Sequence, residues 1–241
     1  QVEQIYEMLK QGEMPTTSMP PMGIIEELFH KLKKDGYEDV IAIPLTSGLS
    51  STSSVMHAVA KECELKLHII ETYSTCNIQC YLAKCAQQLV KQEVAAEEIV
   101  KRLQDSVAHS DTLIIPNDLQ HLKRGGRLTP LAATLGGLLK IKPILKINKE
   151  TNGKIDVVDK VRTMHKAMDM AIEIMRNEHV DDSYMITVAH ADDAVEAEYY
   201  MNKIKAAFPN AKHQIIKLVS VVGVHTGRGC QAVQYFKMIQ E

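Results

Sequence analysis

The stretch Asp39–Ser54, DVIAIPLTSGLSSTSS, decides the fold class of this 241-residue chain. A short apolar run rich in β-formers, Asp39–Leu45, is followed by a loop of glycine, serine and threonine and then by a helical pattern from Ser54. A second strand pattern follows at Lys66–Glu71, after that helix. Strands separated by helices of this length predict βαβ units and a mainly parallel sheet.

The pattern changes character beyond residue 117. Two strand-like runs, Ile141–Ile147 and Lys154–Val158, flank a turn sequence at 150–153 and predict a hairpin. We therefore predict an α/β protein of two lobes, a parallel-sheet N-terminal domain (residues 1–110) and a mixed-sheet C-terminal α/β domain (residues 111–241). The other expected strands are 112–115, 184–189 and 214–222, and the expected helices are 1–11, 24–34, 54–64, 77–92, 95–106, 129–139, 161–178, 195–208 and 230–239.

Composition narrows the classes of function. The chain is 45% hydrophobic and 24% charged with a net charge of −2, which indicates a globular protein without the basic footprint of a nucleic-acid partner. The apolar runs are too short for an integral membrane segment. Five cysteines, an odd number in a chain of this size, disfavour a disulfide framework and favour a cytoplasmic location. Cys76, Cys80 and Cys85 fit small hydrophobic side chains of a helix better than metal ligands, so we predict neither a metal nor a cofactor.

The loop Thr46–Ser54 is the strongest polar signal. It lies after a strand and directly before a helix, where unpaired N–H groups and the helix dipole favour an anion. Gly48 allows close backbone approach, and the hydroxyls add donors without charge. One hydroxyl is enough to cap a helix, whereas seven of these nine residues carry one. The excess favours a cradle for a carboxylate or phosphate over a simple cap.

Two further polar segments are weaker when each is taken alone. Thr17 and Ser18 precede paired prolines and a predicted helix, which an ordinary cap explains. His225 lies in a glycine-rich segment, 223–229, which we expect to join a strand to a helix, and a satisfied loop histidine is the simpler interpretation. The charges of residues 121–127 fit a solvated helix end, although Arg127, beyond two glycines, is the one best placed to reach a ligand.

Two enzyme classes compete with a binding protein. In a serine hydrolase, residues 48–52 (GLSST) would form the nucleophile elbow, with Ser50 as nucleophile and His225 as base. Thr52 stands where the closing glycine of that motif belongs, and no acidic partner stands out. A phosphotransferase with its own nucleotide site would need a phosphate-binding loop of the G-x-x-x-x-G-K-[ST] type, which the sequence lacks.

Six short motifs occur together in a fixed order. Taken as a set, they resemble the DegV family of bacterial fatty-acid-binding proteins, and the similarity runs from about residue 4 to the end of the chain. The motifs are TSMP at 17–20, SGLSST at 47–52, LKRGGRL at 122–128, LLKIKPIL at 138–145, VRT at 161–163 and GVHTG at 223–227.

The resemblance implies a two-domain α/β fold with a long-chain fatty acid buried between the lobes. It also implies a carrier rather than an enzyme, serving as partner of a separate fatty acid kinase that phosphorylates the bound carboxylate. The site residues carried over by motif are Thr17 or Ser18 and Ser50 as hydrogen-bond partners of the carboxylate, Ser47 and Gly48 as its cradle, Arg127 and His225 as flanking groups, and Arg162 as a partner-facing candidate.

The chain departs from the family pattern in three places. Family members usually begin with a strand and an Asp-Ser-Thr loop before the segment that matches residues 1–11, so we expect the N-terminal domain to lack its first strand. Ser51 stands where glycine is usual, and Arg228 stands where proline is common.

Overall fold

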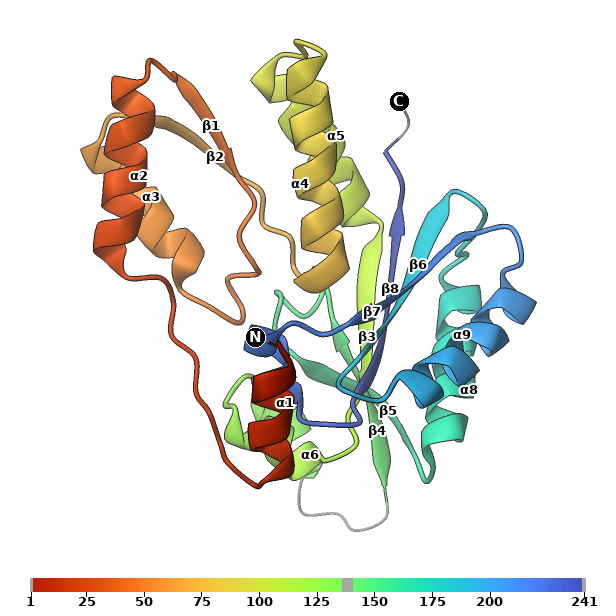
Figure 1. Cartoon of the computed structure of the whole chain (residues 1–241). Coiled ribbons are helices and arrows are strands. Elements are labelled where there is room, and N and C mark those ends of the chain that lie inside the picture. The colour runs from red at the N-terminus through yellow and green to blue at the C-terminus, as the bar shows by residue number, and fades with distance from the viewer. Residues whose placement is uncertain (1, 136–140, 240–241) are drawn as a thin grey trace. The chain divides into compact units, whose positions relative to one another are not determined.

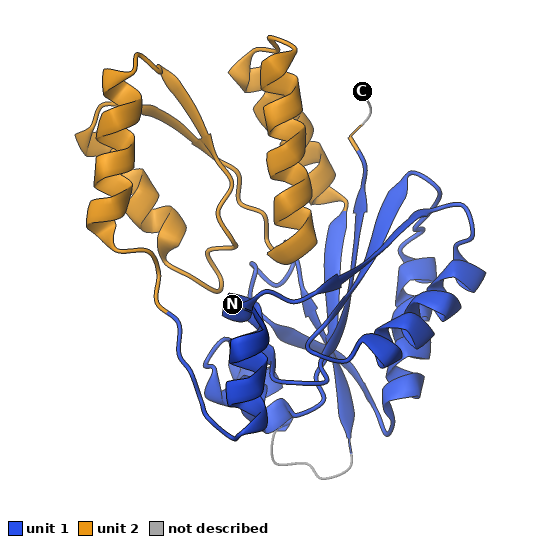
Figure 2. Cartoon of the chain, in the orientation of Figure 1, with its two compact units in different colours: residues 1–17, 110–238 blue, residues 18–109, 239–241 orange. Residues whose placement is uncertain are grey.

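The chain forms two compact units in a computed structural model that describes residues 2–135 and 141–239 (Figure 2). Unit 1 combines residues 1–17 with 110–238, and unit 2 comprises 18–109 with 239–241. Residues 1–17 therefore share their contacts with the part of the chain that begins at Ser110. The proposed domains 1–110 and 111–241 stay a prediction, and the predicted motif and helix residues at 136–140 lie outside the described part.

Unit 2 contains the βαβ arrangement that the sequence predicts. Strands β1 (Asp39–Ala42) and β2 (Lys66–Ile69) pair in parallel, with α3 (Thr52–Glu62) as the connection between them (Figure 1). Phe29 and Val59 belong to a buried cluster that the strand residue Val40 joins. The remaining elements of unit 2 are α2 (Met22–Lys34), α4 (Cys76–Lys91) and α5 (Ala96–Ala108).

Unit 1 is built on a six-stranded mixed sheet with the order β5-β4-β3-β8-β6-β7. Among the described strands of this sheet only β6 and β7 pair in parallel, and the predicted hairpin is confirmed as the antiparallel pair β4–β5. The strands are β3 (Ser110–Ile115), β4 (Lys142–Ile147), β5 (Asp156–Val161), β6 (Tyr184–His190), β7 (Lys212–Lys217) and β8 (Gln231–Lys237). The helices are α1 (Val2–Lys10), α6 (Leu119–Arg124), α7 (Pro130–Thr134), α8 (Met164–Asn177), α9 (Ala194–Ala207) and α10 (Ser220–Thr226). The predicted α/β class with a parallel and a mixed sheet is confirmed.

Helices α8 and α9 cover one face of this sheet (Figure 1). Their buried side chains, such as Met168 and Tyr200, pack against Leu113 of β3 and Val233 of β8. Alternate residues of a strand point to one face, so this apolar set follows from the period of two in each strand. The cluster is the main hydrophobic core of unit 1.

The predicted helix at 230–239 is wrong, because β8 occupies residues 231–237 and pairs with β3 on one side and β6 on the other. A strand buried on both faces shows a nearly continuous apolar run, which its period cannot distinguish from a buried helix. The predicted strand at 214–222 ends at Lys217, and Ser220 begins α10 instead. The segment 223–229 therefore joins a helix to a strand, the reverse of the expected order.

Two further expectations concern the surface and the cysteines. No described helix has both the length and the apolar character that crossing a bilayer would require. All five cysteines are free thiols, of which Cys63 and Cys230 are buried and Cys80 is exposed. The interpretation of Cys76, Cys80 and Cys85 as small core side chains is wrong for Cys80, whereas Cys76 and Cys85 are partly buried.

Candidate functional site

Three of the predicted site residues converge within unit 1. The hydroxyl oxygen of Thr17 lies 2.7 Å from Nε2 of His225, although the two residues are 208 positions apart in the sequence. The guanidinium of Arg127 is close enough to influence the charge state of His225, and it donates a hydrogen bond to the carbonyl of Gly125. We call Thr17, Arg127 and His225 the unit 1 polar cluster.

The environment of His225 favours a neutral imidazole. Burial lowers the pKa of His225 below its ordinary 6.5, and the positive charge of Arg127 and the proximity of His121 lower it further. A neutral imidazole carries one N–H donor and one acceptor nitrogen. The cluster thus combines a hydroxyl, a neutral imidazole and a fixed positive charge, a set suited to an anionic oxygen.

His225 is held in place by α6 as well as by its own helix. His121 of α6 is buried, and its Nε2 donates to the carbonyl of Val224 over 2.7 Å. Gly227 adopts a φ of +73°, and a Cβ there would lie 2.9 Å from the His121 ring. A Cβ on Gly125 would lie 3.0 Å from Nδ1 of His225, so glycine is needed for this approach as well.

The interpretation of residues 121–127 as a solvated helix end is therefore wrong for His121. The sequence pattern did not indicate its role, because a histidine beside charged residues resembles an exposed one. The signal that could have identified it is the glycine at 227, which makes room for the ring.

The serine and threonine loop of unit 2 satisfies most of its own donors. The N–H of Ser47 donates to a carboxylate oxygen of Glu71 over 3.0 Å, and the N–H of Gly48 donates to the Thr46 hydroxyl over 3.2 Å. The Ser50 hydroxyl lies 2.8 Å from that of Thr52 and accepts the Thr52 N–H over 3.3 Å. An anion at Ser47 would have to displace Glu71, a residue that the sequence pattern did not indicate. Ser51 at the N-cap position of α3 makes no side-chain cap hydrogen bond, so the polar groups of the loop are bonded to one another and to Glu71 rather than capping the helix.

The other two predicted site residues lie on the surface of their own units. Ser18 is exposed at the start of unit 2, and Arg162 is exposed between β5 and α8 of unit 1. Thr17 therefore has a contact with another site residue, whereas the geometry gives Ser18 none within its own unit.

The serine hydrolase alternative gains no support from these contacts. A nucleophile must be hydrogen-bonded to its base, at least loosely. Ser50 is bonded to Thr52, and His225 is bonded to Thr17.

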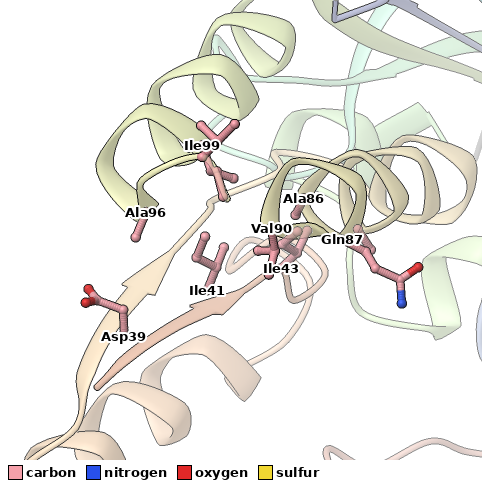
Figure 3. Close-up of a pocket in the computed structure, with 10 residues that line it drawn as sticks. Asp39, Ile41, Ile43, Ala86, Gln87, Val90, Ala96 and Ile99 are labelled. Carbon is pink, nitrogen blue, oxygen red and sulfur yellow. The ribbon is translucent and has the colours of Figure 1, made fainter. Parts of the chain in front are cut away.

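An apolar hollow of about 510 Å³ lies within unit 2 (Figure 3). Ile41 and Ile43, from β1 and the residues after it, face Val90 of α4 and Ile99 of α5. Asp39 lies at its rim, so a carboxylate there would meet a negative charge of the protein. The hollow is therefore a poor place for an anionic headgroup.

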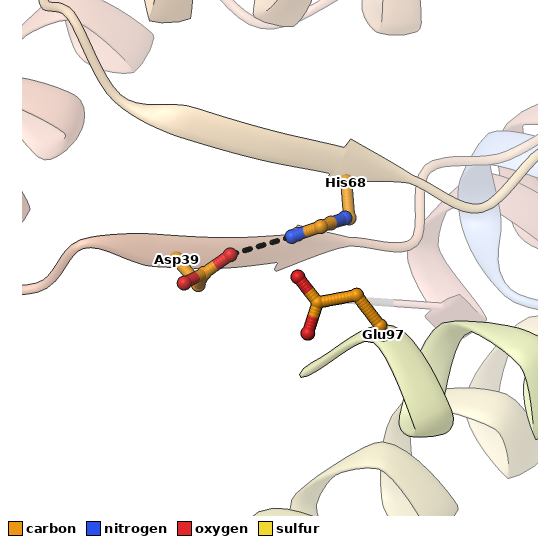
Figure 4. Close-up of side chains that lie close together, drawn as sticks. All are labelled: Asp39, His68 and Glu97. Atoms are coloured by element: carbon orange, nitrogen blue, oxygen red, sulfur yellow. Dashed lines mark hydrogen bonds and ion pairs between the residues drawn. The ribbon is translucent and has the colours of Figure 1, made fainter. Parts of the chain in front are cut away.

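Asp39 also belongs to a group of potential metal ligands in unit 2 with His68 and Glu97, whose ligand atoms lie within 4.8 Å of one another (Figure 4). Lys66 already supplies a positive charge there, with Nζ 2.9 Å from Asp39 and 2.6 Å from Glu97. Nε2 of His68 lies 2.6 Å from Asp39. A cation would compete with this ammonium group. Within the described residues, no such group includes a cysteine.

Comparison with known proteins identifies the family. The family model described as "Uncharacterised protein, DegV family" matches residues 1–238. The chain is 32% identical to Protein DegV of Bacillus subtilis over 230 residues, which cover 94% of this chain and 80% of that protein. It is 33% identical to a DegV domain-containing protein of Halalkalibacterium halodurans over 234 residues, 96% of this chain and 82% of that one.

Solved structures agree with the sequence comparison. A fatty acid binding DegV family protein from Streptococcus agalactiae matches with a TM-score of 0.91 and 30% identity, covering 99% of this chain and 84% of that one. The structure of DegV, a fatty acid binding protein from Bacillus subtilis, matches with a TM-score of 0.86 and 30% identity, covering 98% and 84%. The chain therefore belongs to the DegV family.

Proposed function

We propose that this protein binds a long-chain fatty acid and presents its carboxylate to a separate fatty acid kinase. The observation that carries the proposal is the hydrogen bond between Thr17 and His225 beside Arg127. The chain has this cluster in a fold shared with two proteins that are described as binding fatty acids.

The unit 1 polar cluster has the chemistry that a carboxylate needs. Arg127 offers charge-assisted hydrogen bonds, and Thr17 and neutral His225 offer donors without a second positive charge. The positive charge of Arg127 is then the one formal charge in the cluster that attracts the negative carboxylate. One carboxylate oxygen could remain reactive toward phosphoryl transfer, as a carrier requires.

The acyl tail supplies most of the affinity in this proposal. Burying one methylene is worth about 0.8 kcal/mol, so about fourteen methylenes give roughly 11 kcal/mol before the costs of association. Polar groups at the carboxylate then fix the orientation of the ligand and add a smaller part of the affinity, about 1.5–3 kcal/mol for a charge-assisted hydrogen bond.

Native mass spectrometry of the purified protein, followed by lipid extraction under denaturing conditions, tests the binding. We expect one fatty acid for each chain. A protein that carries none and takes up none when palmitate is added would contradict the proposal.

Replacing Arg127 by methionine is expected to weaken palmitate binding about 10- to 100-fold, because a charge-assisted hydrogen bond is worth about 1.5–3 kcal/mol. Arg124→Met is the matched control, since Arg124 is exposed on the same segment. Isothermal titration of delipidated protein measures both dissociation constants. Equal dissociation constants for the two variants would show that Arg127 does not bind the carboxylate. Ser50→Ala in the same assay tests the loop of unit 2.

Arg162 is the proposed contact for the kinase, because it is exposed and lies apart from the unit 1 polar cluster in sequence. Arg162→Ala is expected to leave the fatty acid content unchanged and to raise the concentration of loaded carrier needed for half-maximal phosphorylation roughly fivefold. Arg176→Ala, another exposed arginine of unit 1, serves as the control. The assay follows phosphate transfer to the loaded carrier at several salt concentrations. Identical behaviour of both variants would reject Arg162 as a kinase contact.

A further inference from the structure

Helix α10, which carries His225, packs against an aromatic side chain of α1. Tyr6 is 2% exposed, and its ring fills the space above Gly223, two residues before His225. A Cβ on Gly223 would lie 2.5 Å from the Tyr6 hydroxyl oxygen and 2.8 Å from Cζ. No larger residue fits at 223 while Tyr6 keeps this position.

Tyr6 also fixes the chain just before α10 begins. Its hydroxyl donates to the carbonyl of Leu218 over 2.9 Å, and the ammonium of Lys217 lies 4.9 Å from the ring centroid. The same side chain therefore holds the end of β7 and the first turn of α10. On the other side, His121 holds the carbonyl of Val224.

The segment that carries Tyr6 also supplies the hydroxyl that bonds His225. Helix α1 ends at Lys10, Gly12 turns the chain with a φ of +85°, and Thr17 follows. This segment thus reaches α10 in two places, beneath the helix through Tyr6 and at the imidazole through Thr17. Thr17 belongs to the N-terminal segment, whereas His225 belongs to α10. A shift of α10 against that segment would therefore change the distance between the two side chains.

We propose that Tyr6 is a positioning residue for His225, which sets the orientation of the imidazole through α10. The role in ligand affinity rests on the proposed function, whereas the effect on the imidazole does not. Loss of the ring lets α10 settle into the space, separates His225 from Thr17 and admits water to the imidazole.

The first test uses ligand-free protein and NMR of the histidine ring nitrogens. With Tyr6→Ala, the pKa of His225 is expected to rise toward 6.5 as burial decreases, and the signal of the nitrogen bonded to Thr17 is expected to shift. Tyr6→Phe keeps the ring but loses the hydrogen bond to Leu218, and it is expected to change both values less than Tyr6→Ala does. Tyr37→Ala, at a tyrosine that is 56% exposed, is the control. Tyr6→Leu replaces the alanine variant if that variant does not fold, which the spread of the amide signals reveals.

The second test measures palmitate affinity in a double-mutant cycle. Tyr6→Ala and Thr17→Val are each expected to raise the dissociation constant about tenfold, and the double variant to raise it by clearly less than the roughly hundredfold product, because Tyr6 and part of the Thr17 effect act through His225. An unchanged His225 signal in Tyr6→Ala, or fully additive effects in the cycle, would overturn the proposal. If no variant and no parent protein binds palmitate, the proposed function fails, while the NMR result still decides the role of Tyr6.

Discussion

Replacing Val233 by aspartate is expected to lower the free energy of unfolding of unit 1 by more than about 4 kcal/mol. Val233 is fully buried in the centre of β8, opposite Leu113 of β3 and Val188 of β6. An aspartate there would place a carboxylate in the apolar core without a partner, or would force it to be protonated. Since small domains are stable by only about 5–15 kcal/mol, this loss would remove a large share of the stability and lower the urea midpoint strongly.

Val195→Asp is the matched control for this change. Val195 is 84% exposed in the first turn of α9, where a negative charge is favoured by the helix dipole. Urea denaturation followed by circular dichroism compares the two variants, because the chain has no tryptophan for fluorescence. Similar midpoints for both variants would show that residue 233 is not in a central strand.

Replacing Asp111 by asparagine is expected to stabilise unit 1 at alkaline pH by on the order of 2–4 kcal/mol. Burial and the negative charge of Glu178 raise the pKa of Asp111 from 3.8 to about 7, although Lys146 opposes the shift. Nζ of Lys146 lies 2.7 Å from Glu178 and 3.4 Å from Asp111. The hydroxyl of Tyr235 donates a hydrogen bond to Glu178. Lys146 and Tyr235 thus interact more closely with Glu178 than with Asp111.

The sign of this effect follows from proton binding. The folded state holds a proton on Asp111 up to about pH 7, whereas the unfolded chain releases it near pH 4. The contribution of Asp111 to the free energy of unfolding is fully present below about pH 4. It falls as the pH rises and is lost above about pH 7. The asparagine variant should therefore match the parent protein at pH 4 and exceed it at pH 8.

Asp181→Asn is a control of opposite sign. Hydrogen bonds from Ser183 lower the pKa of Asp181, so its contribution is present at neutral pH and disappears as the pH falls through the lowered value. This variant should be less stable than the parent at pH 8. Urea midpoints at pH 4 and pH 8 measure all three proteins, and a gain for Asp111→Asn that is independent of pH would contradict the assignment.

Local patterns predicted most of the elements because they fold by short-range rules. The parallel pair β1–β2 and the hairpin β4–β5 have their partners close in the sequence or follow a recognisable turn. Strand β8 pairs with β3, more than 100 residues away, and its apolar residues suit a helix as well as a buried strand. Whether these residues form a strand or a helix depends on pairing with β3 and β6, which a short stretch of sequence cannot show.

The candidate site also contains a part that the sequence could predict and a part that it could not. Ser47, Gly48 and Ser50 could be placed in one loop because they are neighbours in the chain, yet their pairing with Glu71 depends on a second loop. Thr17 and His225 were indicated only by motifs, because separate weak segments carry no sign that they meet. Tyr6 had no signal of its own, since a tyrosine on an amphipathic helix indicates burial without naming its neighbour.

The distance in sequence between Tyr6 and Leu218 has a consequence for synthesis of the protein on the ribosome. The two residues are 212 positions apart, so at 5–20 residues per second roughly 10–40 s pass before the tyrosine can meet its acceptor. Residues 18–109 are contiguous and can fold during this interval. Unit 1 must wait, because β8 lies between β3 and β6 and is made after both of them. The buried face of Tyr6 on α1 therefore lacks its native acceptor until Leu218 has been made.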